Sequence, residues 1–182
     1  MKEKKLSIQQ IAVIGVMTAV ICILAPFSIP IGVVPISFTN LAVYIALYVL
    51  GVKKGTISYV IYLLIGLVGV PVFSSFTSGP GKLFGPTGGY LIGFIPMAVI
   101  AGIFIDKFID KMYLCFLGMV LGTAVCYLFG TAWLAYEASM TFSQALAAGV
   151  IPFIPGDLVK IVIAMLIGPQ IRKALRKAGL YQ

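Results

Sequence analysis

One acid and one base stand three residues apart in an apolar part of the chain. Asp157 and Lys160 lie within the stretch PFIPGDLVKIVIAMLIG, residues 152–168. At this spacing two helical residues share a face, where their charges can neutralise each other. The pair would then offer one fixed hydrogen-bond acceptor and one fixed donor to a small ligand with N–H and C=O groups on one edge. A purely structural ion pair and a lysine that snorkels outward are the alternatives.

The composition indicates which kind of protein positions this pair. Of 182 residues, 61% are hydrophobic and 10% charged, whereas soluble domains are about a quarter charged. Apolar runs near or above ~18 residues recur, which predicts an all-α membrane protein forming a single domain, 1–182. The chain has no histidine, and its three cysteines fall in apolar runs without metal-ligand spacing. We therefore expect neither an enzyme nor a metal or cofactor site.

Lysine, glycine and proline punctuate the apolar runs and predict six transmembrane helices, near 7–26, 35–51, 55–71, 88–105, 112–135 and 151–169. Eleven of the thirteen Lys and Arg fall on the side that holds both termini: Lys2, Lys4, Lys5, Lys53, Lys54, Lys107, Lys111, Arg172, Lys173, Arg176 and Lys177. Since cytoplasmic loops collect such residues, we expect both termini to be cytoplasmic and the protein to cross the cell membrane several times. The net charge of +8 follows from this orientation and from attraction to anionic lipid of the bilayer, so it needs no nucleic acid.

The predicted outer connection 71–89 is rich in Gly, Pro, Ser and Thr. Interrupted segments of this kind point to a binding site in a transporter, although an ordinary exposed loop has the same composition. Within it, GPGKLFG at 79–85 resembles a phosphate loop. Leu83 follows Lys82 where Ser or Thr is needed, and no strand precedes the motif. The chain therefore has no visible means of hydrolysing ATP.

Three motifs, in order, resemble those of one known family: VPISF at 34–38, GPTGGYLIGF at 85–94 and PFIPGDLVK at 152–160. Over nearly its whole length the chain resembles BioY, the biotin-specific substrate-binding subunit of energy-coupling factor transporters. It departs from that family at Thr39-Asn40, where Gln-Thr is usual. It departs again at Lys82, where an apolar residue is expected.

The resemblance implies a six-helix subunit that binds biotin on the outer side. It would work with a transmembrane coupling protein and two cytoplasmic ATPase subunits. Asp157 would accept a hydrogen bond from a ureido N–H of biotin, and Lys160 would donate to the ureido carbonyl. The biotin carboxylate would face backbone N–H groups around Thr87, Gly88 and Gly89.

Four further residues complete the site that the resemblance implies. Tyr90 and Phe38 would pack on the bicyclic ring of biotin, although ordinary core aromatics would look the same in sequence. Thr39 and Asn40 would supply polar lining.

Small residues in the first span indicate a second surface. Ala12, Gly15 and Ala19 are spaced i, i+3, i+7, and such faces let helices approach closely in lipid. In the family, a small-residue face on this helix contacts the coupling protein. Packing within the subunit explains the pattern equally well from sequence alone.

Three other functions remain open at this stage. The chain could bind another vitamin in the same role. As a self-sufficient secondary carrier, it would use Asp157 to titrate with a coupling proton. As a scaffold, it would use the Asp157–Lys160 pair for structure only.

Overall fold

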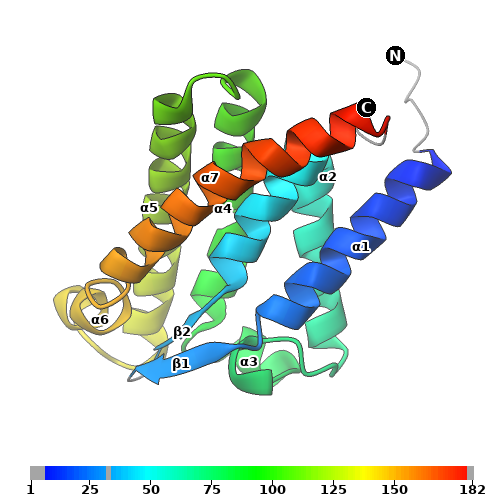
Figure 1. Ribbon diagram of the computed structural model, residues 1–182. Helices are drawn as coiled ribbons and strands as arrows, with labels where there is room; N and C mark the ends of the chain where they lie inside the picture. The colour runs from blue at the N-terminus through cyan, green and yellow to red at the C-terminus, as the bar shows by residue number, and fades with distance from the viewer. Residues whose placement is uncertain (1–6, 32–33, 180–182) are drawn as a thin grey trace, which may run out of the picture.

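The computed structural model describes residues 7–31 and 34–179, which form seven α-helices and one two-stranded hairpin (Figure 1). Helix α1 (Ile8–Leu24) begins at a capping box. The Ser7 hydroxyl accepts from the Gln10 N–H at 3.2 Å, and the Gln10 side chain accepts from the Ser7 N–H at 3.1 Å. These bonds satisfy two of the N–H groups that the first turn of a helix leaves open.

The hairpin follows α1 and pairs β1 (Ser28–Ile31) with β2 (Val34–Ser37) in antiparallel register, Ser28 opposite Ser37. The prediction of an all-α protein holds for most of the chain, but the predicted start of a span at residue 35 was wrong, because Val34–Ser37 form a strand. Pro30 and Pro35 lie opposite each other in the two strands. Proline fits an exposed strand edge and disrupts a helix interior. The next helix therefore begins only at Thr39.

Helix α2 (Thr39–Leu67) is broken at Gly51, which has φ 74° and ψ 175°. A residue with a side chain rarely adopts this positive φ, so glycine is needed where the chain turns back. The two halves of α2 run in opposite directions (Figure 1). The predicted division between the spans 35–51 and 55–71 therefore falls at the observed break.

The chain between α2 and the next long helix is irregular, as predicted, with only a 3₁₀ turn (Ser74–Phe76) and the short α3 (Pro80–Leu83). Then come α4 (Gly88–Lys107), α5 (Met112–Glu137), α6 (Phe142–Gly149) and α7 (Ile154–Lys177). Helix α6 was not predicted. Helix α7 also continues past the predicted end at 169, through Pro169.

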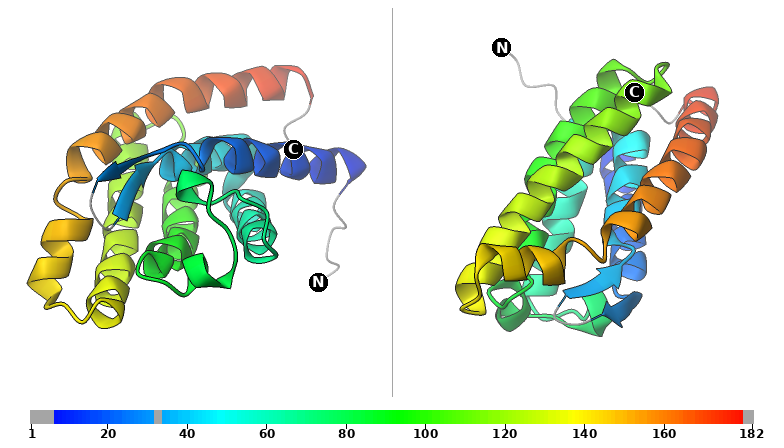
Figure 2. Two further views of the ribbon diagram at one scale, coloured as in Figure 1. Left: turned by 90° about the horizontal axis from the view of Figure 1, so that it is seen from below. Right: turned by 90° about the vertical axis from the view of Figure 1, so that its left-hand side faces the viewer.

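Four helices, α2, α4, α5 and α7, are long and apolar enough to cross a membrane, and α1 is a shorter apolar helix of 17 residues. The start of α1, the break in α2, the α4–α5 connection and the end of α7 gather at one end of the molecule (Figures 1 and 2). The hairpin, α3 and α6 lie at the other, which we name the hairpin end. The predicted basic connections within the described residues thus share one end, whereas Lys2, Lys4 and Lys5 lie outside the described residues. The six-span count and the cytoplasmic termini remain predictions.

Candidate ligand-binding site

A cavity of about 660 Å³, counting the part open to solvent, lies at the hairpin end. Segments from β2, α2, α4, α5 and the α6–α7 region form its wall. Ten polar residues line it: Ser37, Thr39, Asn40, Ser74, Thr87, Tyr90, Thr123, Tyr127, Asp157 and Lys160. Apolar side chains, among them Phe94, Met97 and Phe153, fill the rest of the wall.

Asp157 and Lys160 form a buried ion pair in the cavity wall. The Lys160 Nζ donates to Asp157 Oδ1 at 3.0 Å, and the two residues are only 9% and 7% exposed. Asp157 lies in the first turn of α7, where the helix dipole favours a negative charge. The pair therefore presents fixed donor and acceptor groups at a site largely shielded from solvent.

Two residues that the sequence analysis missed hold this pair in place. The Tyr127 hydroxyl donates to Asp157 Oδ2 at 2.6 Å, and the Lys160 Nζ also donates to the Ser37 carbonyl at 2.6 Å. Ser37 ends β2, so the hairpin positions the lysine directly. Ser37 stands inside the quoted motif VPISF, which was a usable signal. Nothing in the sequence indicated that Tyr127 on α5 would meet the start of α7.

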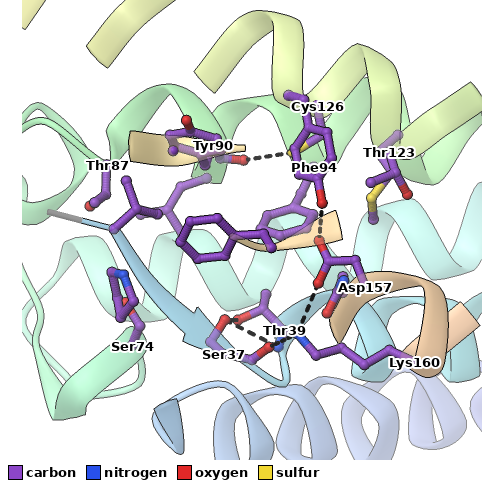
Figure 3. Close-up of a pocket in the computed structure, with 18 residues that line it drawn as sticks. Ser37, Thr39, Ser74, Thr87, Tyr90, Phe94, Thr123, Cys126, Asp157 and Lys160 are labelled. Carbon is purple, nitrogen blue, oxygen red and sulfur yellow. Dashed lines mark hydrogen bonds and ion pairs between the residues drawn. The ribbon is translucent and has the colours of Figure 1, made fainter. Parts of the chain in front are cut away.

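The structure brings six of the predicted site residues to the cavity: Thr39, Asn40, Thr87, Tyr90, Asp157 and Lys160. Figure 3 shows Ser74 and Thr87 at the opposite end of the cavity from Asp157 and Lys160. Phe94 stacks edge-on against Tyr59, with ring centroids 5.7 Å apart. The cavity is thus elongated, with its lining charges at one end and the Ser74 and Thr87 side chains at the other.

Phe38, Gly88 and Gly89 were expected in the site but do not line the cavity. Phe38 is 45% exposed beside the start of α2. Gly88 already donates its N–H to the Gly85 carbonyl at 2.9 Å. Lys82 also lies outside the lining, and its partial burial lowers the pKa of its ammonium group.

The buried glycines of the GPTGG motif serve helix packing instead. A Cβ atom on Gly89 would lie 2.2 Å from the Trp133 Cβ and 2.9 Å from the Phe129 carbonyl oxygen. The close approach of α4 to α5 therefore requires glycine at this position.

We expect Gly89→Ala to lower the free energy of unfolding by about 1–3 kcal/mol, because overpacking forces neighbouring atoms to shift. Thermal unfolding in detergent measures the loss. Gly81→Ala is the control, since a Cβ there has no heavy atom within 4 Å. Equal unfolding temperatures for Gly89→Ala and the parent would contradict this account of the motif.

The small residues of α1 lie on its outer face. Ala12, Gly15 and Ala19 are exposed, and a Cβ on Gly15 would meet nothing within 4 Å. Helix α1 packs inward through other residues: Ile14, Met17, Thr18 and Ile21. Gly15 and Ala19 instead line an open apolar groove with Ile61 and Ile65 of α2. Packing within the subunit therefore does not explain the small-residue pattern.

Long apolar helices around a cavity with both polar and apolar lining residues are typical of a membrane protein with a small-molecule site at one end of a helical bundle. The sequence model of the BioY family matches residues 1–177, and the chain belongs to this family.

Named relatives and a solved structure agree with this assignment. The chain is 37% identical over 166 residues to "Biotin transporter BioY" of Thermotoga maritima, covering 91% of this chain and 96% of the relative. It is 32% identical over 171 residues to "Biotin transporter BioY2" of Lactococcus lactis subsp. cremoris, covering 94% of each. The structure superposes with a TM-score of 0.84, at 30% identity, on a crystal structure described as the S-component for biotin from an ECF-type ABC transporter. That match covers 91% of this chain and 92% of the other.

Proposed function

We propose that the chain binds biotin in this cavity and serves biotin uptake as the substrate-specific subunit of an ATP-driven transporter. The carrying observation is the buried Asp157–Lys160 pair at one end of an elongated cavity. A neutral ureido ring meeting a mutually neutralised pair avoids burial of a net charge. The relatives named biotin transporters and the structure of a biotin S-component support the same ligand. Its role is that of a transporter subunit, not of an enzyme.

Both charged groups keep hydrogen-bonding capacity for the ligand. Lys160 uses two of its three N–H donors, on Asp157 and on the Ser37 carbonyl. Asp157 accepts two hydrogen bonds, whereas a carboxylate offers about four acceptor positions. In this arrangement the biotin tail extends toward Ser74 and Thr87, and its carboxylate meets their hydroxyl groups. Tyr90 packs beside the ring system.

The proposed topology has six spans, with α2 supplying two of them and the hairpin end facing outward. The basic residues that follow the break in α2, flank the α4–α5 connection and end α7 all lie at the opposite end of the molecule. Lys and Arg collect on the cytoplasmic side, so this distribution supports cytoplasmic termini in the plasma membrane.

The proposed partners are a transmembrane coupling protein and two cytoplasmic ATPase subunits. The exposed face of α1 that carries Ala12, Gly15 and Ala19 is the proposed contact with the coupling protein. Small residues there would let a partner helix approach closely. The incomplete phosphate loop at 79–85 supports a separate source of ATP hydrolysis.

Calorimetry on the purified, ligand-stripped chain tests the proposed function. Titration with biotin is expected to give saturable binding, and titration with other vitamins is not. If another vitamin binds tightly instead, that vitamin replaces biotin as the proposed substrate, and the proposed role as a transporter subunit stands. Failure to bind any vitamin would favour a scaffold. Proton-coupled uptake into vesicles that contain only this chain would favour a secondary carrier.

A further inference from the structure

A carboxylate on α4 joins three helices at the end of the molecule opposite the cavity. Asp106 Oδ2 accepts a hydrogen bond from the Val52 N–H at 2.7 Å, and Asp106 Oδ1 pairs with Arg172 of α7. One side chain thereby connects α4, the break in α2 and the last part of α7.

The contact with α2 replaces a hydrogen bond that the helix break removes. Because Gly51 has non-helical φ and ψ, the Val52 N–H starts a new helical segment and needs an acceptor from outside it. Asp106 supplies that acceptor as a capping residue from a neighbouring helix. A Cβ on Gly51 would lie 3.0 Å from Asp106 Oδ2, so glycine also makes room for the carboxylate.

The contact with α7 involves a buried charge. Arg172 is only 2% exposed, although the sequence analysis placed it in a basic connection. It became part of α7 because the helix continues through Pro169. Close packing accompanies the ion pair on two sides. A Cβ on Gly168 would lie 2.2 Å from the Tyr48 ring, and one on Gly102 would lie 2.8 Å from the Val52 Cβ.

In α2 and α7, the distance along the helix from the junction to the cavity wall is the same number of residues. From Gly51 to Thr39 along α2, and from Arg172 to Lys160 along α7, the separation is 12 residues in each case. This corresponds to about 18 Å of helix. The third helix, α4, carries Tyr90 at its far end. All three helices therefore run from the Asp106 junction to residues of the cavity wall.

We propose that Asp106 is a positioning residue for ligand binding. By joining α2, α4 and α7 at one end, it sets the spacing of Thr39, Tyr90 and Lys160 at the other, without touching the ligand. That the ligand is biotin rests on the proposed function. That Asp106 sets the spacing of the cavity wall rests on the geometry of the junction.

The test compares Asp106→Asn and Arg172→Gln with the parent by calorimetry with biotin. Asp106→Asn removes the partly exposed carboxylate charge that pairs with the buried Arg172, and Arg172→Gln removes the buried charge itself. Each variant is expected to weaken biotin binding about tenfold, equivalent to ~1.4 kcal/mol. The double variant Asp106→Asn/Arg172→Gln should recover part of that affinity, because it keeps hydrogen-bonding groups and leaves no member of the pair charged. If a single variant does not fold, Arg172→Lys provides a milder change with the same readouts.

A second readout needs no ligand. Cys126 lies in the cavity wall and is 3% exposed. If the junction sets the spacing of the wall, Asp106→Asn should speed the alkylation of Cys126 by a maleimide in the ligand-free protein. Peptide mapping distinguishes it from Cys22 and Cys115.

Ser58→Ala is the matched control. The Ser58 hydroxyl is fully buried and lies 3.0 Å from the Thr18 hydroxyl between α1 and α2, outside the cavity lining and the junction. It should lower the unfolding temperature but change neither affinity nor Cys126 alkylation.

Parent-like affinity and parent-like Cys126 alkylation in folded Asp106→Asn would overturn the inference. So would an equal loss of affinity in Ser58→Ala, because a general loss of stability would then explain both. If the parent itself does not bind biotin, the proposed function fails, and the Cys126 rates alone decide the role of Asp106.

Discussion

Lys160→Ala is expected to bind biotin at least about a hundredfold more weakly than the parent. The substitution leaves Asp157 charged in a wall from which its cation has been removed, and it also frees the Ser37 carbonyl. Removing one member of a buried pair costs about 3–5 kcal/mol, and each ~1.4 kcal/mol is a factor of ten in affinity. Part of that cost falls on folding. Calorimetry is therefore restricted to preparations that remain monodisperse in detergent.

Asp157→Asn is the sharper companion, because it keeps the size of the side chain and one acceptor while removing the charge. It should weaken biotin binding markedly in a folded protein. Tyr127→Phe is the mildest change of the three, since it removes only the hydrogen bond to the charged Asp157 at Oδ2. It should weaken biotin binding by about 1.5–3 kcal/mol at most. If folded Asp157→Asn and folded Lys160→Ala both bind biotin like the parent, the pair is structural and the site lies elsewhere.

Gly15→Leu is expected to abolish assembly with the coupling protein and leave biotin binding nearly intact. Gly15 is exposed in the groove between α1 and α2, so a leucine there fits the isolated subunit without a clash. The same side chain would hold a partner helix away from a face that small residues keep open. Co-purification with the coupling protein and calorimetry with biotin separate the two effects.

Val16→Leu is the control for this experiment. Val16 neighbours Gly15 and is 61% exposed, but it does not line the groove. It should leave both assembly and binding unchanged. Unchanged co-purification of Gly15→Leu would count against this surface as the partner contact.

The helices were largely predictable because their apolar runs are long and end at glycine or basic residues. The predicted division after residue 51 coincides with the break that Gly51 makes, and 88–105 lies within α4. The hairpin was missed because VPISF reads equally well as the start of a buried helix. Residues 34–37 form a strand because they pair with residues 28–31. That pairing depends on how α1 and α2 are arranged in space.

The candidate site was predictable where its chemistry is local in sequence. Asp157 and Lys160 stand one helical turn apart, so their ion pair follows from spacing. The contacts of Lys160 with Ser37 and of Asp157 with Tyr127 span 123 and 30 residues. No periodicity encodes such separations. Phe38 lies outside the cavity lining, because a motif identifies a segment but not the direction in which each side chain points.

The break at Gly51 also has a consequence for where the short first half of α2 can lie. In the proposed six-span arrangement, residues 39–50 rise only about 18 Å, against a hydrocarbon thickness of ~30 Å. Neighbouring helices bury this half of α2 almost completely, with Ala42, Tyr44 and Leu47 at 0% exposure, so protein rather than lipid covers it. Non-helical backbone at membrane depth is tolerated where protein covers it, so this half of α2 can be shorter than the bilayer and end at a break that the Asp106 cap completes.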